Sequence, residues 1–229
     1  MEQLVNGFTL NIPEASFPLS TDSMLLSDFV RLPRRARVLD LGSGCGTLGV
    51  LLCARDPGCY VTGIELSEAS HTAALENIAD NNLSSRMESI CDDLRSLRQT
   101  LPAGKFHVCV SNPPYFTGGP ASVKHATARQ QEQCTTEELC SAAAYALRYG
   151  GDFYLVHKPE YLAQICSCAA TAGLEPKELC LVRHRPDMDH NLILLKCRKG
   201  GKPGLKLSEL CLFRTDGSPT DYYKKLYRL

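Results

Sequence analysis

The chain has 229 residues, with 25 lysines and arginines against 25 aspartates and glutamates, so its formal net charge is zero at pH 7. This length suits one domain with a full core, and the balanced charge excludes a global basic field, so a nucleic-acid partner would need a local basic patch. Many of the twelve cysteines sit in apolar runs and no C-x-x-C pair occurs, which argues against a metal site or a disulfide framework. Without a signal-peptide pattern or an apolar run long enough for a membrane, we expect a protein of the reducing cytoplasm.

The first thirty residues predict an extended arm or hairpin followed by a helix. Gly7, Pro13 and Pro18 lie around short apolar patches in residues 1–20. Thr21-Asp22-Ser23 can then cap a helix that begins its apolar face at Met24.

Residues 37–54 read as a strand, a glycine turn and a helix. The apolar strand 37–41 carries an acid, Asp40, and glycines follow at positions 42, 44 and 46. Glycine permits the tight turn and lets a ligand approach the backbone. The spacing is G-x-G-x-G rather than the G-x-G-x-x-G of a dinucleotide fold, and an anion at the strand end favours a cationic cofactor such as S-adenosylmethionine over NAD or ATP. An ordinary tight turn is the alternative.

Acids end the next two predicted strands. Residues 59–64 form a strand-like run that is followed by Glu65, roughly twenty residues past the glycines. At this spacing nucleotide-binding folds place a carboxylate that contacts the ribose hydroxyls. A helix over 67–79 follows, and Asn77, Asn81 and Asn82 mark its end and turn. The strand 87–91 then leads to Asp92 and Asp93. As acids at a strand end they are candidates for a ligand contact, and the alternative is that they cap a short helix that begins at Leu94.

The most specific motif is Asn112-Pro113-Pro114-Tyr115, directly after an apolar strand over 106–111. The Asn112 side-chain oxygen and the Pro113 carbonyl can accept hydrogen bonds from a planar amine and make its nitrogen more pyramidal, while the prolines fix the loop. Tyr115, or Phe116 behind it, can stack on a planar substrate. A rigid turn at a strand end is the alternative.

The remaining elements alternate between helices and strands until the chain reaches a hairpin and an extension. In order, we expect a long loop over 116–136, a helix over 136–149 ended by Gly150-Gly151, a strand over 152–157, a helix over 160–172, hairpin strands over 179–185 and 191–198, a strand over 205–213 and a Tyr- and Lys-rich tail over 219–229. Alternating strands and helices favour a parallel sheet with right-handed crossovers.

Taken together, the glycine motif 40–46, Glu65 and Asn112-Pro113-Pro114-Tyr115 resemble the amino-methylating class I S-adenosylmethionine-dependent methyltransferases over nearly the whole chain. The resemblance is closest to the bacterial tRNA(Val) adenine-N6 methyltransferase family, to which Phe116, Ala128-Arg129, Val156-His157-Lys158-Pro159-Glu160 and Leu226-Tyr227 are also similar. It implies an α/β fold, a Rossmann-like seven-stranded mostly parallel sheet with an antiparallel terminal hairpin and helices on both faces. The expected single domain, 1–229, divides into an N-terminal arm and helix (1–30), a cofactor-binding core (31–198) and a C-terminal extension (199–229).

The same resemblance implies the functional residues. Those expected to bind the cofactor are Asp40, Gly42, Ser43, Gly44, Gly46, Glu65, Leu66, Asp93 and Asn112. Asp92 is the alternative to Asp93 for the contact with the adenine amino group of the cofactor. Those expected in catalysis are Asn112, Pro113, Pro114 and Tyr115, and those expected to bind substrate are Tyr115, Phe116 and Arg129. The segment 20–26 resembles one that lies over the cofactor site in this family. Where the family usually has Ala-Arg-His-Glu, this chain has Ala128-Arg129-Gln130-Gln131, which leaves the exact substrate in doubt.

We therefore expect an enzyme that uses S-adenosylmethionine to methylate a planar exocyclic amine, adenine N6 in tRNA before others. A local basic patch would hold the RNA, with candidates Arg183, His184, Arg185, Lys196, Arg198, Lys199, Lys202, Lys206, Lys224, Lys225 and Arg228. The first alternative is a protein glutamine-N5 or ribosomal RNA guanine-N2 methyltransferase, although these families usually carry a recognition domain ahead of the core and only about thirty residues precede this one. The second is a non-catalytic cofactor-binding RNA-interaction module, against which the intact Asn-Pro-Pro-Tyr motif counts.

Overall fold

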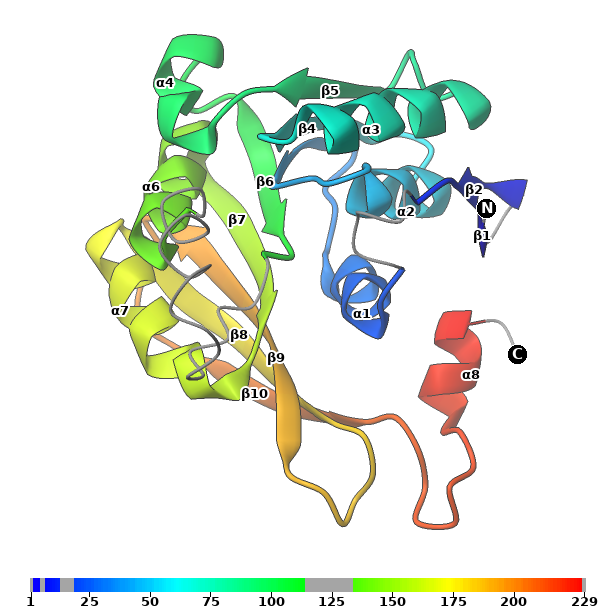
Figure 1. Cartoon of the computed structure of the whole chain (residues 1–229). Helices are drawn as coiled ribbons and strands as arrows, with labels where there is room; N and C mark the ends of the chain where they lie inside the picture. Colours follow the sequence, from blue (N-terminus) through cyan, green and yellow to red (C-terminus); the bar gives the residue numbers. More distant parts are fainter. Residues whose placement is uncertain (1, 5–6, 13–18, 114–133, 228–229) are drawn as a thin grey trace, which may run out of the picture.

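The computed structural model describes residues 2–4, 7–12, 19–113 and 134–227, and their main feature is one eight-stranded sheet (Figure 1). The strands follow the spatial order β10-β8-β9-β7-β6-β3-β4-β5. Their bounds are β3 (Arg37–Leu41), β4 (Tyr60–Glu65), β5 (Met87–Cys91), β6 (Phe106–Ser111), β7 (Leu147–His157), β8 (Leu174–Arg183), β9 (His190–Lys199) and β10 (Lys206–Cys211).

The sheet is parallel except around β9, which runs antiparallel to both β7 and β8. The predicted α/β class, the mostly parallel sheet and the terminal hairpin are thus confirmed. The sheet has eight strands rather than the seven expected, because the strand predicted in the C-terminal extension pairs with β8 in parallel and becomes the edge strand β10.

Helices cover both faces of the sheet, as Figure 1 shows. Their bounds are α1 (Thr21–Phe29), α2 (Thr47–Arg55), α3 (Glu68–Asp80), α4 (Leu97–Thr100), α6 (Thr136–Ala146), α7 (Leu162–Thr171) and α8 (Asp221–Tyr227), with 3₁₀ turns η2 (Leu94–Ser96) and η3 (Pro159–Tyr161). Helices α1, α2 and α3 bury one apolar cluster against the sheet, and α4, α6 and α7 bury the other. Along β3, Val38 belongs to the first cluster while Leu39 and Leu41 belong to the second, because successive side chains of a strand point to opposite faces.

The prediction of a helix over residues 136–149 was partly wrong. Helix α6 begins at Thr136, where Thr135 and Glu138 form a reciprocal cap, but it ends at Ala146 and strand β7 starts at once. The strand pairs with β6 at Leu147, then bulges, and resumes its register at Asp152. Gly150, with φ of 76°, belongs to this bulge and does not end the helix.

Both ends of the described chain pack beside the core. The arm forms a short antiparallel pair, β1 (Glu2–Gln3) with β2 (Thr9–Leu10), which confirms the predicted hairpin. At the other end the Tyr-rich tail forms α8, which lies near α1 in Figure 1 and contacts it. Among the described helices, none has the length and apolar composition needed to cross a membrane.

Candidate active site at the carboxyl edge of the sheet

The ends of β3, β4 and β6 meet at one edge of the sheet and are joined by hydrogen bonds. The backbone N–H groups of Gly42 and Ser43 both donate to Ile64 O, at 3.0 and 2.9 Å. On the other side, the buried Ser111 hydroxyl donates to Leu41 O at 2.8 Å. The glycine turn and the residues after β6 are therefore placed side by side, at the edge where parallel α/β sheets bind ligands.

The glycine turn needs its glycines for two different reasons. All three predicted glycines have positive φ, which other residues rarely adopt: 72° at Gly42, 55° at Gly44 and 83° at Gly46. A Cβ added at Gly42 or Gly44 would meet nothing within 4 Å, so the backbone there faces open space. At Gly46 a Cβ would come within 2.9 Å of Met87 Cε, so this third glycine serves packing. The open stretch at 42 and 44 fits a ligand that approaches the main chain.

Glu65 braces this turn in the structure. Its Oε2 accepts the Gly44 backbone N–H and its Oε1 accepts the Ser67 N–H, both at 2.8 Å. Leu66, the next residue, is 49% exposed. A planar group that covered Leu66 would remove this apolar surface from water.

The carboxyl group of Asp40 lies inside the molecule, 1% exposed, and neither oxygen has a hydrogen-bond partner among the described residues. Burial and the nearby Glu65 charge raise the pKa of Asp40 to about 7. A buried, unpartnered carboxyl favours a cation close to it. This observation and the open glycine turn fit S-adenosylmethionine, whose sulfonium and ammonium groups are cationic.

Ser43 is placed differently from its neighbours in the motif. Its side chain is 7% exposed, its Oγ has no hydrogen-bond partner in the described part of the chain, and it fills the space left by Gly63. A Cβ at Gly63 would lie 2.7 Å from this Oγ. The structure thus directs the Ser43 hydroxyl into the sheet rather than toward the open edge.

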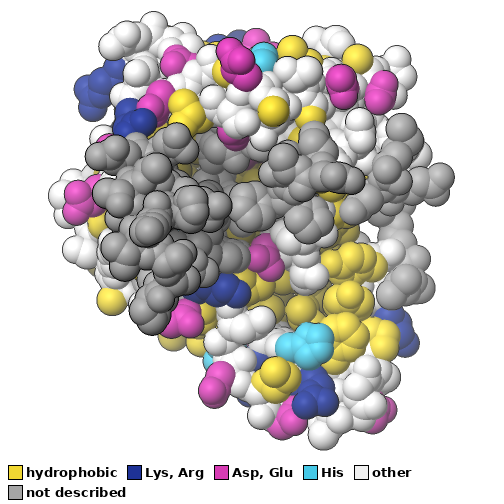
Figure 2. Space-filling view, viewed as in Figure 1, with side chains coloured by type: hydrophobic (Ala, Val, Ile, Leu, Met, Phe, Trp, Pro, Cys, Tyr) yellow, Lys and Arg dark blue, Asp and Glu magenta, His cyan; other side chains and the backbone are white. Residues whose placement is uncertain are grey.

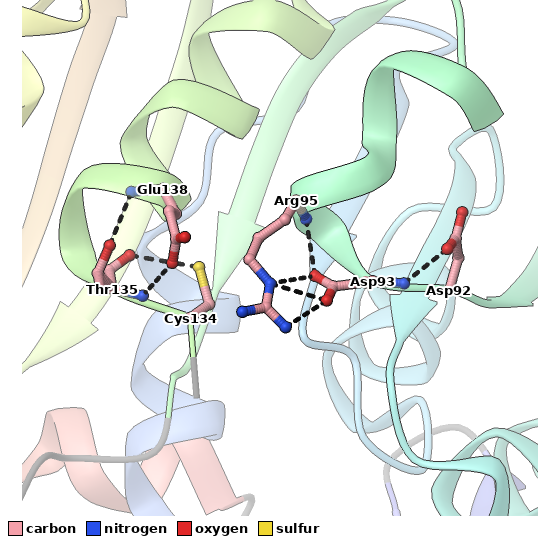
Figure 3. A network of polar contacts seen from close by, with 6 residues as sticks. All are labelled: Asp92, Asp93, Arg95, Cys134, Thr135 and Glu138. Atoms are coloured by element: carbon pink, nitrogen blue, oxygen red, sulfur yellow. Dashed lines mark hydrogen bonds and ion pairs between the residues drawn. The ribbon is translucent and has the colours of Figure 1, made fainter. Parts of the chain in front are cut away.

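The acids after β5 form the polar network of Figure 3. Asp93 caps the η2 turn by accepting the Arg95 N–H at 2.8 Å, and its carboxylate pairs with the Arg95 guanidinium. Asp92 turns back, with Oδ1 accepting the Asp93 N–H at 2.7 Å and Oδ2 bonded to Thr100. Both acids therefore have local partners. For Asp93 the structure agrees with the alternative stated from the sequence, in which this acid caps the short helix.

Figure 3 also shows the Arg95 side chain reaching from η2 toward the residues that begin α6. Its bond to Asp93 holds the pKa of that carboxyl below its usual range. Arg95 is a site neighbour that the sequence reasoning missed, since no pattern marked an arginine two residues after the acid.

Asn112 follows β6 directly and is half-buried. Its Nδ2 donates to Ser23 Oγ in the first turn of α1, at 3.0 Å. The segment 20–26 and the Asn-Pro-Pro-Tyr motif are therefore in contact, through residues 89 positions apart. Pro113 is the last described residue of this stretch; the predicted residues Pro114, Tyr115, Phe116 and Arg129, together with Gln130 and Gln131, lie outside the described residues.

The role of Asn77 also differs from the prediction, which placed it at the end of a helix. It lies inside α3, 1% exposed, and its Nδ2 donates to Cys45 O in the glycine turn and to Asn11 O in the arm, both at 2.9 Å. Its Oδ1 accepts the Asn11 N–H. Asn81, one turn later, bonds Thr9 in the same way. Two asparagines four residues apart on one helix face were the available signal.

Among the candidate basic residues, Arg228 lies outside the described residues, and the others separate into two groups at opposite ends of the sheet, with Lys199, Lys202 and Lys206 at the end where β9 finishes and β10 begins. Lys196 and Arg198 pair in register with Tyr154 and Asp152 of β7, away from the carboxyl edge, and both make ion pairs with Asp152. The end of β8 and helix α8 carry the other group, namely Arg183, His184, Arg185, Lys224 and Lys225. Arg183 pairs with Glu209.

The second group surrounds an apolar surface. Figure 2 shows hydrophobic side chains gathered between α1, α8 and the β8–β9 hairpin, with histidine, lysine and arginine side chains near them. In this region the rings of His184, Phe213, Tyr223 and Tyr227 follow one another with centroids 4.5 to 4.6 Å apart. Cationic and aromatic side chains together are typical of surfaces that bind RNA.

Comparison with known proteins gives consistent matches. Residues 20–165 match the family model described as the methyltransferase small domain. A tRNA1(Val) (adenine(37)-N6)-methyltransferase of Photobacterium profundum is 30% identical over 72% of this chain and 70% of that protein. One of Shewanella sp. (strain MR-4) is 27% identical over 96% of this chain and 97% of that protein. Among solved structures, a predicted O-methyltransferase from Agrobacterium tumefaciens has a TM-score of 0.77 and 24% identity, covering 91% of this chain and 96% of that one, a likeness of fold alone.

Proposed function

The chain belongs to the methyltransferase small domain family and is an S-adenosylmethionine-dependent methyltransferase, and from this premise we propose that its methyl acceptor is the N6 amino group of an adenine in tRNA. The relatives named above as tRNA1(Val) (adenine(37)-N6)-methyltransferases support this acceptor. The observation that carries it is the position of Asn112 and Pro113, at the end of β6 beside the open glycine turn. A tRNA substrate would also place the enzyme in the cytoplasm.

The cofactor would be held by groups at the ends of three neighbouring strands. S-adenosylmethionine, when bound, supplies a methyl group attached to a positively charged sulfur. Gly42 and Gly44 leave the backbone open to it, and the buried Asp40 carboxyl favours its positive charge. Glu65 would contact the ribose hydroxyls and Leu66 would cover the adenine ring. Asp93 would receive the adenine amino group after releasing part of its contact with Arg95.

The acceptor nitrogen would be prepared by two oxygens. An exocyclic amine shares its lone pair with the ring, so it is a poor nucleophile until its N–H groups are drawn out of that plane. Asn112 Oδ1 and the Pro113 carbonyl can each accept one N–H, and proline fixes the backbone that carries this carbonyl. The leaving thioether is neutral, and the nitrogen becomes acidic once it is alkylated, so water can take its proton while the two acceptors hold the amine by hydrogen bonds.

The RNA would approach from the side of α8 and the β8–β9 hairpin. His184, Arg185, Lys224 and Lys225 lie near the carboxyl edge, whereas Lys196 and Arg198 lie away from it in ion pairs with Asp152. This arrangement supports an RNA-binding patch with fewer basic residues than the full set of candidates from the sequence. Phosphate contacts of this kind weaken as salt is added. An unpaired loop adenine has a smaller unstacking cost than a base in a duplex, so a few contacts are sufficient.

The proposal is tested by methyl transfer from labelled S-adenosylmethionine to bulk tRNA, with ribosomal RNA and release factor offered in parallel and nucleoside analysis of the product. N6-methyladenosine in tRNA is the expected result. Label in guanine of ribosomal RNA or in glutamine of protein would contradict the acceptor while leaving the family unchanged.

The role of Asn112 is tested by Asn112→Ala. We expect turnover to fall by at least about 100-fold, because one of the two acceptors aimed at the amine is removed. Cofactor affinity, measured by calorimetry, should stay within about fivefold of the wild type, since a single neutral contact is worth about 1 kcal/mol. Undiminished turnover in this variant would contradict the mechanism.

A further inference from the structure

The amide of Asn112 is held by helix α1 and not by the sheet that carries it. The donor in this contact is Nδ2 and the acceptor is Ser23 Oγ, at 3.0 Å. Ser23 is 6% exposed and Asn112 is half-buried, so the Ser23 end of the bond is shielded from water. A hydrogen bond shielded in this way keeps its geometry, because leaving either partner unsatisfied would cost more than the bond itself gains.

Ser23 is itself fixed on a rigid element. Its backbone N–H donates to the Oγ of Ser20, the residue that caps α1, at 3.3 Å, and the two hydroxyl oxygens lie 3.5 Å apart. At the other end of α1, Arg55 Nη2 donates to Val30 O at 2.8 Å. The acceptor offered to Asn112 therefore has a defined position at both the residue and the helix level.

A carboxamide has two chemically opposite arms, since its nitrogen only donates and its oxygen only accepts. We propose that Ser23 is a positioning residue: its hydroxyl directs its own proton to Ser20 Oγ, 3.5 Å away, accepts the Nδ2–H of Asn112, and thereby turns Oδ1 toward the amine to be methylated. In the reverse orientation the amide would point N–H groups at the N–H groups of the acceptor and oppose the reaction. The inference rests on the role proposed above for Asn112, and it adds the residue that selects the orientation of its amide.

The first experiment compares Ser23→Ala with Ser27→Ala. Ser27 lies one turn further along α1 and is equally buried, at 6% exposed, so it controls for the loss of a buried hydroxyl from the same helix. We expect Ser23→Ala to lower kcat about tenfold, the equivalent of one neutral hydrogen bond, and Ser27→Ala to leave kcat within about twofold. The dissociation constant for S-adenosylmethionine should be unchanged in both. Equal losses of kcat in the two variants, or an undiminished kcat in Ser23→Ala, would overturn the inference.

The second experiment repeats Ser23→Ala in the Asn112→Asp background. A carboxylate presents two equivalent acceptors, so it has no wrong orientation for Ser23 to prevent. We therefore expect Ser23→Ala to cost about tenfold beside the native asparagine and less than about twofold beside the aspartate, a non-additivity that is diagnostic of direct coupling. A tenfold cost in both backgrounds would mean that Ser23 acts on the shape of the site and would overturn the proposal.

The failure of this inference can be told apart from a failure of the proposed function. If the methylated product is a guanine or a glutamine, the acceptor is wrong, and the same serine comparison is made on that substrate. If Asn112→Ala keeps full turnover, the proposed role of Asn112 fails whatever Ser23 does. If Asn112→Ala loses turnover and Ser23→Ala does not, only the positioning role of Ser23 is overturned.

Discussion

The two halves of the sheet hold their functional groups by different means. In the half formed by β3, β4 and β5, the glycine turn is fixed mainly through main-chain groups, with Gly42 and Ser43 bonded to Ile64 O and Gly44 bonded to Glu65. In the half that includes β6, β7 and the C-terminal strands, side chains make the decisive contacts. Asn112 bonds Ser23, and Tyr222 and Tyr227 of α8 bond Asp28 and Thr21 of α1, each at 3.0 Å.

The contrast lies in sequence distance as well as in chemistry. Gly44 and Glu65 are 21 positions apart, whereas Tyr222 and Asp28 are 194 apart and Tyr227 and Thr21 are 206 apart. A binding site made from one contiguous turn depends on backbone conformation, which the spacing of glycines in the sequence predicts. A site made from distant side chains depends on how whole elements pack. The half formed by β3, β4 and β5, here called the cofactor half, therefore uses a general backbone motif. The half that includes β6, here called the acceptor half, is where this chain can define its own substrate.

The largest expected effect comes from Asp40, a buried side chain of the cofactor half. Its pKa is raised from an ordinary value near 4 to about 7 in the folded protein. Between these two pH values the folded protein retains a proton that the unfolded chain has released, so the free energy of unfolding falls as pH rises. We expect a loss of a few kcal/mol between pH 4 and pH 7, at about 1.4 kcal/mol per pKa unit, and no further loss from this group above that range.

Asp40→Asn isolates this effect, because asparagine does not titrate. Denaturant unfolding of the cofactor-free protein at several pH values should show a smaller decline of stability in the variant than in the wild type. Parallel curves for the two proteins would show that Asp40 does not ionise differently on folding.

The next effect concerns the glycine turn and has a matched control. Gly44→Ala and Gly150→Ala both place a Cβ at a positive φ, of 55° and 76°, and in both positions the Cβ would meet nothing within 4 Å. We expect each variant to lose about 1–2 kcal/mol of stability from backbone strain. Only Gly44→Ala should also bind S-adenosylmethionine more weakly, by about tenfold or more, because its methyl group lies where the cofactor approaches the backbone. Equal cofactor affinity in the two variants would break the argument that this half works through its main chain.

The smallest effect is expected in the acceptor half, where α8 holds α1. Tyr227→Phe removes the hydroxyl bonded to Thr21, and we expect it to reduce the free energy of unfolding by about 1 kcal/mol. Tyr149→Phe is the control, because that hydroxyl bonds Gly200 O from a side chain 80% exposed, where water can replace it. Thermal or chemical unfolding of the two variants makes the comparison, and a loss as large in Tyr149→Phe would mean that the α1–α8 contact has no special weight.

The same contrast explains what the sequence could predict. The bounds of β3, β5 and β6 follow from short apolar runs between polar turns, and the structure has them over the predicted residues. The bulge around Gly150 was missed because a glycine pair after a helical pattern reads equally well as a helix end. Asn77 was misjudged because its partners in the arm and in the glycine turn lie more than 30 positions away.

The candidate site divides along the same line. Gly42, Gly44 and Asp40 could be found because spacing and charge within one turn indicate a ligand, and the structure shows their open backbone and unpartnered carboxyl. The contact between Ser23 and Asn112 could not be derived, since nothing in either segment specifies which rotamer meets which. The hydroxyl of Ser43 illustrates the reverse case, a residue inside the motif whose side chain serves packing against Gly63.

The link between Thr21 and Tyr227 has a kinetic consequence. It closes a loop of 206 positions, and the entropy lost on closing such a loop can be repaid only after the sheet between the two residues has formed. We therefore expect the α1–α8 contact to form in the last steps of folding and to break in the first sub-global openings of the native state. Each such opening would release α8 from α1, which keeps its contacts with α2 and its bond from Arg55, so the aromatic surface can come apart while Ser23 and the glycine turn stay in place.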